Sequence, residues 1–151
     1  MTDSRLAAPH RAGPGSVSAT RTGNRTYEGR NEQGDTVLIG PAGTPGHFSP
    51  GELFKLALAG CAGMSSDRVI SRRLGDDYEG IVWAHGTSDE KADRYFAVDE
   101  EILLDLETLG ESERATLATI IGKAIDASCT IARSVRDSVE LSTTVNGSPL
   151  H

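Results

Sequence analysis

Two cysteines, Cys61 and Cys129, are the side chains of this 151-residue chain that could do thiol chemistry. The thiolate is the nucleophilic form of cysteine, and a free thiol with a pKa of about 8.5 is mostly protonated at neutral pH. Two cysteines without a C-x-x-C motif are too few for a secreted disulfide scaffold, so the default is two separate free thiols. Free cysteines are usually small buried hydrophobic residues rather than nucleophiles. The sequence leaves both interpretations open.

A reactive thiol needs a neighbouring group that favours its ionised form. Cys129 opens a predicted helix, whose N-terminus favours negative charge, whereas Cys61 lies about three turns inside another helix. Cys61 therefore needs a positive charge from elsewhere in the fold. The predicted N-terminal hairpin offers Arg21, Arg25 and Arg30. For each arginine taken alone, a solubilising role on the strand surface is the simpler interpretation.

Other kinds of site have weak support. The four histidines are scattered along the chain, and no pair has the spacing of a metal site. The stretch GPAGTPG lacks the Lys-Ser/Thr of a phosphate-binding loop and follows no βαβ pattern. We therefore expect neither a metal nor a nucleotide cofactor.

Composition and charge narrow the class of protein further. Fifteen basic against 22 acidic residues give a formal net charge of −7, which argues against nucleic acid or an anionic membrane as a partner. No apolar run approaches the roughly 18 residues of a spanning helix, and the polar N-terminus lacks a signal-peptide core. We expect a cytoplasmic protein with a flexible N-terminal tail over residues 1–15 and a single domain over residues 16–151.

The stretch SPGELFKLALAGC predicts the helix that positions Cys61. Ser49 is a good N-cap, Pro50 suits the first helical position, and Glu52 completes an S-x-x-E capping box. From residue 53 to 64 only Lys55 is charged, so the helix is expected to be buried on most sides. It lies either at the centre of the fold or in a subunit interface. It should end near residue 75, where a glycine follows a basic last turn.

The remaining segments predict mostly strands, with two further helices near the C-terminus. A meander of three short strands comes first, then the central helix, two long strands, two helices and a last strand. This order indicates an α+β fold rather than a doubly wound sheet. The expected strands span residues 16–22, 25–31, 35–40, 78–88, 94–107 and 139–147; turns fall at 23–24 and 32–34, and helices span 110–128 and 129–137.

The second long strand carries a polar interruption. Its apolar residues alternate and so share one face, but Glu100 falls in the same register. We expect a bulge or a strand end at that residue. The apolar residues of the shared face are Phe96, Val98, Ile102, Leu104 and Leu106.

Taken together, the hairpin, the helix start SPGELFKLALAGC and the later DASCTIARSV resemble the OsmC/Ohr family. These are the osmotically inducible and organic-hydroperoxide-resistance proteins, and the resemblance covers about residues 16–147. It implies an OsmC-like α+β fold with an N-terminal β-meander, a long central buried helix, a second β-hairpin, C-terminal helices and a last strand. It also implies an intertwined homodimer, which would cover a helix that is apolar on nearly every side.

The resemblance further implies a thiol-dependent peroxidase without a cofactor other than its redox-active cysteine pair. Cys61 would attack the O–O bond of an organic hydroperoxide and become a sulfenic acid, and Cys129 would resolve it as a disulfide. Arg25 matches the arginine that stabilises the thiolate, with Arg30 and Arg21 as substitutes. A dithiol reductant, in the Ohr branch a lipoyl-bearing protein, would restore the thiols.

The catalytic glutamate of the family matches Gly51 here, and the nearest carboxylate is Glu52. Nine residues of helix place Glu52 on the opposite face from Cys61 and roughly 13 Å along the axis. Glu52 therefore serves the capping box or, if it meets an active site, one shared across the dimer. The alternative function is an OsmC-like dimer without peroxidase activity, whose cysteines are structural or form a redox switch.

Overall fold

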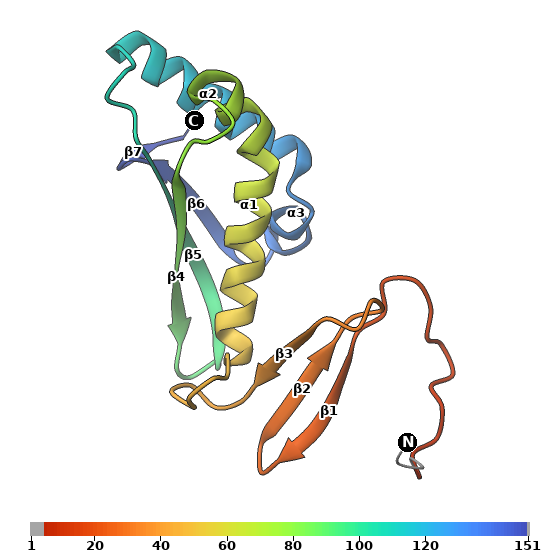
Figure 1. Ribbon diagram of the computed structural model, residues 1–151. Coiled ribbons are helices and arrows are strands. Elements are labelled where there is room, and N and C mark those ends of the chain that lie inside the picture. Colours follow the sequence, from red (N-terminus) through yellow and green to blue (C-terminus); the bar gives the residue numbers. More distant parts are fainter. Residues whose placement is uncertain (1–4, 151) are drawn as a thin grey trace. The chain divides into compact units, whose positions relative to one another are not determined.

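The computed structural model describes residues 5–150, which fall into two compact units, one up to Glu52 and one from Leu53 onward (Figure 1). Within the predicted tail, residues 1–4 lie outside the described range, and residues 5–15 form neither helix nor strand. That residues 16–151 make up a single domain stays a prediction.

The first unit is the predicted three-stranded meander. Strands β1 (Ser18–Gly23), β2 (Thr26–Arg30) and β3 (Thr36–Ile39) pair antiparallel in that order. The first turn lies one residue later than predicted, because Gly23 pairs with Thr26 and leaves Asn24 and Arg25 as the turn. Arg25 itself adopts the left-handed conformation, with φ at 58°.

Helix α1 (Pro50–Leu74) has both predicted ends. The Ser49 N–H donates to Glu52 Oε1 at 3.0 Å, and the Glu52 N–H donates to Ser49 Oγ at 3.1 Å, which completes the capping box. At the other end, Gly75 takes a φ of 97° and its N–H donates to the Ser71 carbonyl at 2.8 Å. Glycine tolerates this left-handed conformation, so it ends the helix at little cost.

The second unit is built on a four-stranded sheet with the order β4-β5-β6-β7. Its strands are β4 (Gly80–Asp89), β5 (Arg94–Leu104), β6 (Glu140–Val145) and β7 (Ser148–Pro149). Strands β5 and β6 run parallel and the other neighbours antiparallel. A parallel pair needs a long crossover, which α2 (Glu111–Ser128) and α3 (Thr130–Val135) provide. Strand β7 was not predicted, because two residues are too few for a periodic pattern.

The main core of this unit lies between one face of the sheet and the helices α1 and α2. Strand β5 contributes alternate residues to it, α1 and α2 contribute helical stripes, and Cys129 is part of the same cluster. Figure 1 shows α1 running along the sheet, with α2 near one end of it. The buried members of this cluster are Ala62, Ile70, Ile102, Leu104, Leu106, Leu117, Ile121, Ile125, Cys129 and Val145.

The predicted buried face of β5 is correct except at Phe96, which is 44% exposed. A register shift between Thr87 and Ser88 of β4 makes Phe96 an extra residue on β5. The alternation is thereby displaced, and Tyr95 packs on α1 instead, with its ring stacked on Phe54 at a centroid distance of 5.6 Å. The bulge expected at Glu100 therefore lies nearer the start of the strand, and β5 continues unbroken through Glu100 to Leu104.

Candidate active site

The two cysteines, which the sequence placed on separate helices, lie together in the second unit. Cys61 is half-buried on α1 and packs against the cluster that contains Cys129. Cys129 is only 1% exposed. Both are free thiols and are hydrogen-bonded to each other. The structure thus brings together the two residues that the sequence singled out for redox chemistry.

Cys129 reaches the core because it interrupts the helical backbone between α2 and α3. Its φ of −80° and ψ of 95° are extended, so α2 ends and α3 begins at this residue. Its N–H donates to the Ile125 carbonyl at 2.8 Å, and its own carbonyl accepts from the Arg133 N–H at 3.1 Å. The first N–H groups of α3 have no partners within that helix and are available to other acceptors.

Cys61 uses those free N–H groups. Burial alone would raise the pKa of its thiol, but hydrogen bonds to the sulfur outweigh that effect and hold the pKa below its ordinary value. The donors are the Cys129 thiol, the Ile131 N–H, the Ser65 hydroxyl and the Thr130 N–H. Hydrogen bonds to the charged form of a group favour that form, so the site favours the Cys61 thiolate.

The pKa of the Cys129 thiol is shifted in the opposite direction, upward. Burial raises the pKa of the Cys129 thiol to about 11, and the hydrogen bond it donates to Cys61 adds to the increase. A hydrogen bond from the Ala132 N–H lowers the pKa in part, and the smaller effects of the charges of Cys61 and Glu100 raise it further. The site therefore favours the thiolate form at Cys61 and the protonated thiol at Cys129.

The Cys61 side of the pair opens on a cavity of about 630 Å³ between α1 and the start of α3. Its walls are mostly apolar, and Ser65 supplies a hydroxyl next to the sulfur. A small substrate with an alkyl group could therefore approach Cys61 while Cys129 stays buried. The residues lining it are Leu56, Ala57, Gly60, Cys61, Met64, Ser65, Ser128, Thr130 and Ile131.

Glu100 is a buried carboxyl on the face of β5 that the helices cover, where it is only 3% exposed. Thr143, opposite it on β6, donates a hydrogen bond to Oε2 at 3.4 Å. Oε1 has no hydrogen-bond partner among the residues that the structure describes. Burial raises the pKa of Glu100 to about 7, although the Thr143 hydrogen bond lowers it in part.

Comparison with known proteins identifies the family. A family model described as OsmC-like protein matches residues 43–144. An uncharacterized protein of Mycobacterium tuberculosis is 44% identical over 126 residues, which cover 83% of this chain and 89% of the relative. The chain belongs to the OsmC-like protein family. The resemblance inferred from the cysteines and the helix start is thereby confirmed.

Solved structures with the same architecture confirm the OsmC-like α+β fold. A hypothetical protein from Aquifex aeolicus matches with a TM-score of 0.70 at 14% identity, covering 89% of this chain and 96% of that chain. The organic hydroperoxide resistance protein OhrB of Bacillus subtilis matches with a TM-score of 0.58 at 19% identity, covering 87% and 96%. At these identities the likeness shows the fold, and the activity of this OsmC-like chain is treated below.

The other predicted site residues of the OsmC-like chain lie in the first unit. Arg25 and Arg21 are exposed at the β1–β2 turn and on β1, and both line a cavity that extends to Pro50. Arg30 forms an ion pair with Glu28 at 2.7 Å, which engages its guanidinium locally. Glu52 forms the capping box described above. Catalytic roles for Arg25 and Glu52 stay predictions.

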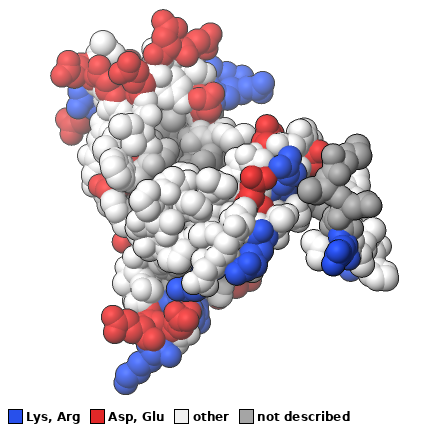
Figure 2. Space-filling model, turned by 60° about the horizontal axis from the view of Figure 1, so that its bottom comes forward, with Lys and Arg blue, Asp and Glu red and all other residues white. Residues whose placement is uncertain are grey.

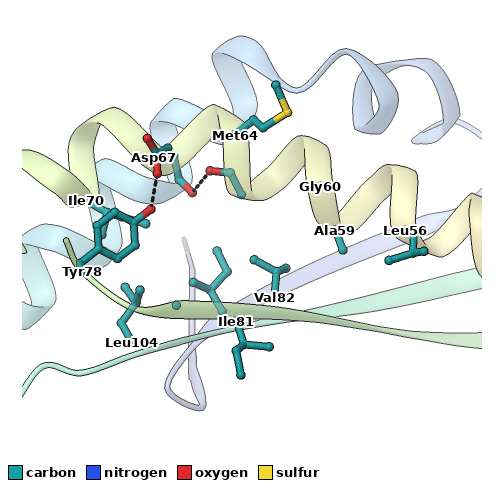
Figure 3. Close-up of a pocket in the computed structure, with 14 residues that line it drawn as sticks. Leu56, Ala59, Gly60, Met64, Asp67, Ile70, Tyr78, Ile81, Val82 and Leu104 are labelled. Carbon is teal, nitrogen blue, oxygen red and sulfur yellow. Dashed lines mark hydrogen bonds between the residues drawn. The ribbon is translucent and has the colours of Figure 1, made fainter. Parts of the chain in front are cut away.

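A second cavity, of about 620 Å³, lies between α1 and strands β4 and β5 (Figure 3). It adjoins the first cavity, with which it shares Leu56, Gly60 and Met64 of α1. Tyr78 stands at one end, where its hydroxyl donates to Asp67 at 2.5 Å. Burial and this carboxylate raise the pKa of Tyr78 to about 12, so the hydroxyl stays protonated. Leu56 and Ile81, which line the same cavity, are exposed apolar side chains.

Three groups around the sulfurs were not identified from the sequence. Ser65 could have been found, because it lies four residues after Cys61 and so on the same face of α1. Glu100 was marked only as an interruption of an apolar face. The N–H groups of Thr130 and Ile131 leave no side-chain signal, since any residue could supply them.

Within the described range, no group of three or more His, Cys, Asp or Glu residues is arranged to hold a metal ion. No helix among residues 5–150 is long and apolar enough to cross a membrane.

Proposed function

We propose that this OsmC-like protein is a thiol-dependent peroxidase that reduces organic hydroperoxides. The proposal rests on one observation above all: Cys61 and Cys129 are hydrogen-bonded, with Cys61 favoured as the thiolate and Cys129 held as the thiol. Burial in apolar surroundings raises the pKa of an inert structural cysteine, whereas the pKa of Cys61 is lowered. The structural likeness to a protein named for organic hydroperoxide resistance is consistent with this activity.

In the proposed reaction the Cys61 thiolate attacks the terminal oxygen of the hydroperoxide. The O–O bond breaks, an S–O bond forms, and the alkoxide leaves as the alcohol after taking a proton from solvent. Cys61 is thereby oxidised to a sulfenic acid. Cys129 then forms a disulfide with Cys61 and displaces water, and an external dithiol returns both residues to thiols. The mostly apolar wall beside Cys61 favours alkyl hydroperoxides over hydrogen peroxide.

Thiol counting tests the proposal directly. Reduced protein mixed with cumene hydroperoxide should rapidly lose both of its thiols, and the Cys61→Ser variant should keep its remaining one. Cys129→Ser should still consume one equivalent of hydroperoxide and stop at the sulfenic acid. Thiols that stay unreactive until the protein is denatured would leave the alternative function, an OsmC-like dimer with structural cysteines. Turnover with dihydrolipoamide, compared with a monothiol, tests the predicted dithiol reductant.

Arg25 is the proposed cationic partner of Cys61, with Arg30 and Arg21 as substitutes. If Arg25 stabilises the thiolate, Arg25→Ala should raise the pKa of Cys61, measured as thiolate absorbance against pH. Arg30→Ala should then leave the pKa of Cys61 unchanged, because the Arg30 guanidinium pairs with Glu28, and a higher pKa in Arg30→Ala would instead identify Arg30 as the partner. An unchanged titration in Arg25→Ala would remove Arg25 from the site.

We also propose that the protein works as a homodimer. On the second unit, large apolar residues of α1 and β4 are exposed, including Met64 at 82%, Ile81 at 56% and Trp83 at 53%. Figure 2 shows that a broad part of one face carries neither acidic nor basic side chains. A second copy would bury such a surface. Sedimentation at micromolar concentration should show dimers, and Met64→Lys should shift the population toward monomers; a wild-type monomer would refute the proposal.

A site shared between the two chains is the remaining role for Glu52. Mixed dimers of Glu52→Gln and Cys61→Ser chains would then regain activity that each variant lacks alone. Inactive mixed dimers would leave Glu52 with its capping role only. A cytoplasmic location stays a prediction.

A further inference from the structure

Glu100 is a buried ionisable group in the core. Neither the packing of the core nor the activation of the proposed nucleophile, Cys61, explains why a carboxyl lies there. It occupies a position in β5 where the neighbouring inward residues, Val98 and Ile102, are fully apolar. A carboxyl buried without full hydrogen bonding is expensive, and Oε1 lacks a partner among the described residues. A buried polar group with an unpaired oxygen and a shifted pKa is a candidate for a functional role.

The surroundings of Glu100 place it at the junction of α2 and α3. On the same face of β5, Ile102 packs in the cluster that contains Cys129, and Val98 packs in a cluster that Ile131 and Ala132 join. Glu100 lies between these two residues, and its charge interacts with that of Cys129. The carboxyl therefore belongs to the core near the α2–α3 junction, and it does not line the cavity at Cys61.

We propose that Glu100 accepts the proton of Cys129 when the resolving thiol attacks the oxidised Cys61. This inference rests on the proposed peroxidase function. Before oxidation, the Cys129 thiol donates its hydrogen bond to the Cys61 thiolate. After oxidation that anion is gone, and Glu100 is the remaining ionisable group that interacts with Cys129 in the part of the chain described here.

The proton balance of the step is simple. The Cys129 S–H bond breaks and the proton moves to the Glu100 carboxylate, so the buried site keeps one negative charge throughout. The Cys129 thiolate then attacks Cys61 Sγ; an S–S bond forms, the S–O bond of the sulfenic acid breaks, and the hydroxide leaves as water with a proton from solvent. Glu100 later returns its proton to solvent. The net change is a sulfenic acid plus a thiol giving a disulfide plus water.

Oxidation of Cys61 removes effects that oppose this transfer, and the pKa of Glu100 allows the carboxylate to accept the proton. The hydrogen bond and the charge of Cys61, which both raise the pKa of Cys129, disappear when Cys61 becomes neutral. Glu100 itself, with a pKa of about 7, is partly ionised at neutral pH and so can act as an acceptor there.

Among residues 5–150, the elements packed around Glu100 present no titratable neighbour other than the cysteine pair. Its neighbours across the sheet are Ala84 on β4 and Thr143 on β6, neither of which titrates. Helix α1 contributes Leu58 and Ala62 to the two flanking clusters. From the α2–α3 junction the titratable neighbour is Cys129, with Cys61 beyond it. A pH dependence of the resolving step near neutrality would therefore report on Glu100.

The experiment separates the two oxidation steps in a single turnover. Wild-type protein and Glu100→Gln are mixed with one equivalent of cumene hydroperoxide, and the Cys61 sulfenic acid and the Cys61–Cys129 disulfide are followed by trapping and mass measurement. Glu100→Gln should form the sulfenic acid at the wild-type rate and the disulfide at least about 10-fold more slowly at neutral pH. The wild-type disulfide rate should rise with pH through an inflection near the Glu100 pKa of about 7, and Glu100→Gln should lack that inflection.

Two comparison variants keep the result interpretable. Glu101→Gln changes the next residue on β5, whose side chain is 44% exposed and pairs with His85 of β4, and it should keep the wild-type disulfide rate because that carboxylate does not interact with Cys129. Thr143→Val keeps the Glu100 carboxyl but removes a hydrogen bond that lowers its pKa, so the inflection should move to higher pH. A wild-type disulfide rate and pH profile in Glu100→Gln would overturn the proposal.

A second readout does not depend on peroxide chemistry. Methyl methanethiosulfonate converts the accessible Cys61 to a methyl disulfide, and attack by Cys129 then releases methanethiol. Glu100→Gln should slow this release by a similar factor, with the same loss of the inflection. If wild-type protein forms no sulfenic acid, the proposed peroxidase function fails, and the methanethiol release still decides the role of Glu100. An unchanged release rate in Glu100→Gln would then overturn that role as well.

Discussion

Replacing Glu100 by glutamine should change how the stability of the folded protein depends on pH, whatever the protein catalyses. In the unfolded chain the carboxyl ionises near its ordinary pKa of 4.5, whereas burial in the folded protein raises the pKa to about 7. Between these values the folded state binds more protons than the unfolded state. The free energy of unfolding must therefore fall as the pH rises through this window.

The size of the effect follows from the two pKa values. A shift of this size corresponds to about 3 kcal/mol of destabilisation, fully present above the folded pKa and absent below the unfolded one. At about pH 5 the Glu100 carboxyl lowers the free energy of unfolding by about 1 kcal/mol. The free energy of unfolding should therefore fall by a further 2 kcal/mol, roughly, between about pH 5 and about pH 8.5. Because Glu100 is only 3% exposed, little of this effect should be screened by solvent.

Urea denaturation at several pH values, under reducing conditions, measures this loss. The glutamine amide of the variant has its own burial cost, so the absolute stability of the variant is uninformative, but that cost does not vary with pH. The difference in unfolding free energy between wild type and Glu100→Gln should therefore change by about 2 kcal/mol across the window. Glu101→Gln removes a partly exposed carboxylate that pairs with His85, and it should change the curve by well under half of the Glu100→Gln effect, because exposed ion pairs contribute about 0–1 kcal/mol. Parallel curves for wild type and Glu100→Gln would show that the carboxyl is not buried as described.

Three further predictions concern the fold that positions the site. Thr144→Val should leave the unfolding free energy unchanged or raise it by about 1 kcal/mol, because the buried Thr144 hydroxyl has no partner among the described residues. Thr143→Val should lower the unfolding free energy by about 1–3 kcal/mol, because it removes the hydrogen bond to Glu100. Equal urea midpoints for the two variants would contradict this pair of predictions. Ser49→Ala removes the capping box of α1 and should lower the unfolding free energy by about 1 kcal/mol. An unfolding free energy equal to that of the wild type in urea denaturation would mean that the capping box does not stabilise the helix. Gly86→Ala should lower the unfolding free energy, since an added Cβ would lie 2.6 Å from the Tyr95 ring. In a Tyr95→Leu background the loss should be smaller. An equal loss in both backgrounds would exclude the contact with Tyr95 as the cause.

Local sequence rules gave most of the elements of this fold. The capping box, the terminating glycine and the apolar run defined α1 from Pro50 to Leu74, because these signals act through the backbone of the same segment. Alternation identified β4 and β5, and helical spacing identified α2. The two cysteines were found by their chemistry and by the helix start that precedes Cys61.

Errors arose where one element responds to another. The bulge opposite Thr87 displaced the alternation of β5, so that Tyr95 rather than Phe96 packs on α1. The first hairpin turn lies one residue later than expected, since pairing of Gly23 with Thr26 sets the register. Register depends on contacts between strands, and a single strand read alone does not contain it.

The sequence by itself determined which residues could react and which segments carry them: a thiol inside an apolar helix, a second thiol at a helix boundary, and a carboxyl in the apolar register of a strand. Only the tertiary structure decided how these groups differ in protonation. The pKa of a thiol depends on burial and on donors within hydrogen-bonding distance, and here those donors come from α3 and Ser65 while the carboxyl comes from β5. Such distances are set by packing between segments far apart in the chain, and so the pairing of Cys61, Cys129 and Glu100 became visible only in the folded molecule.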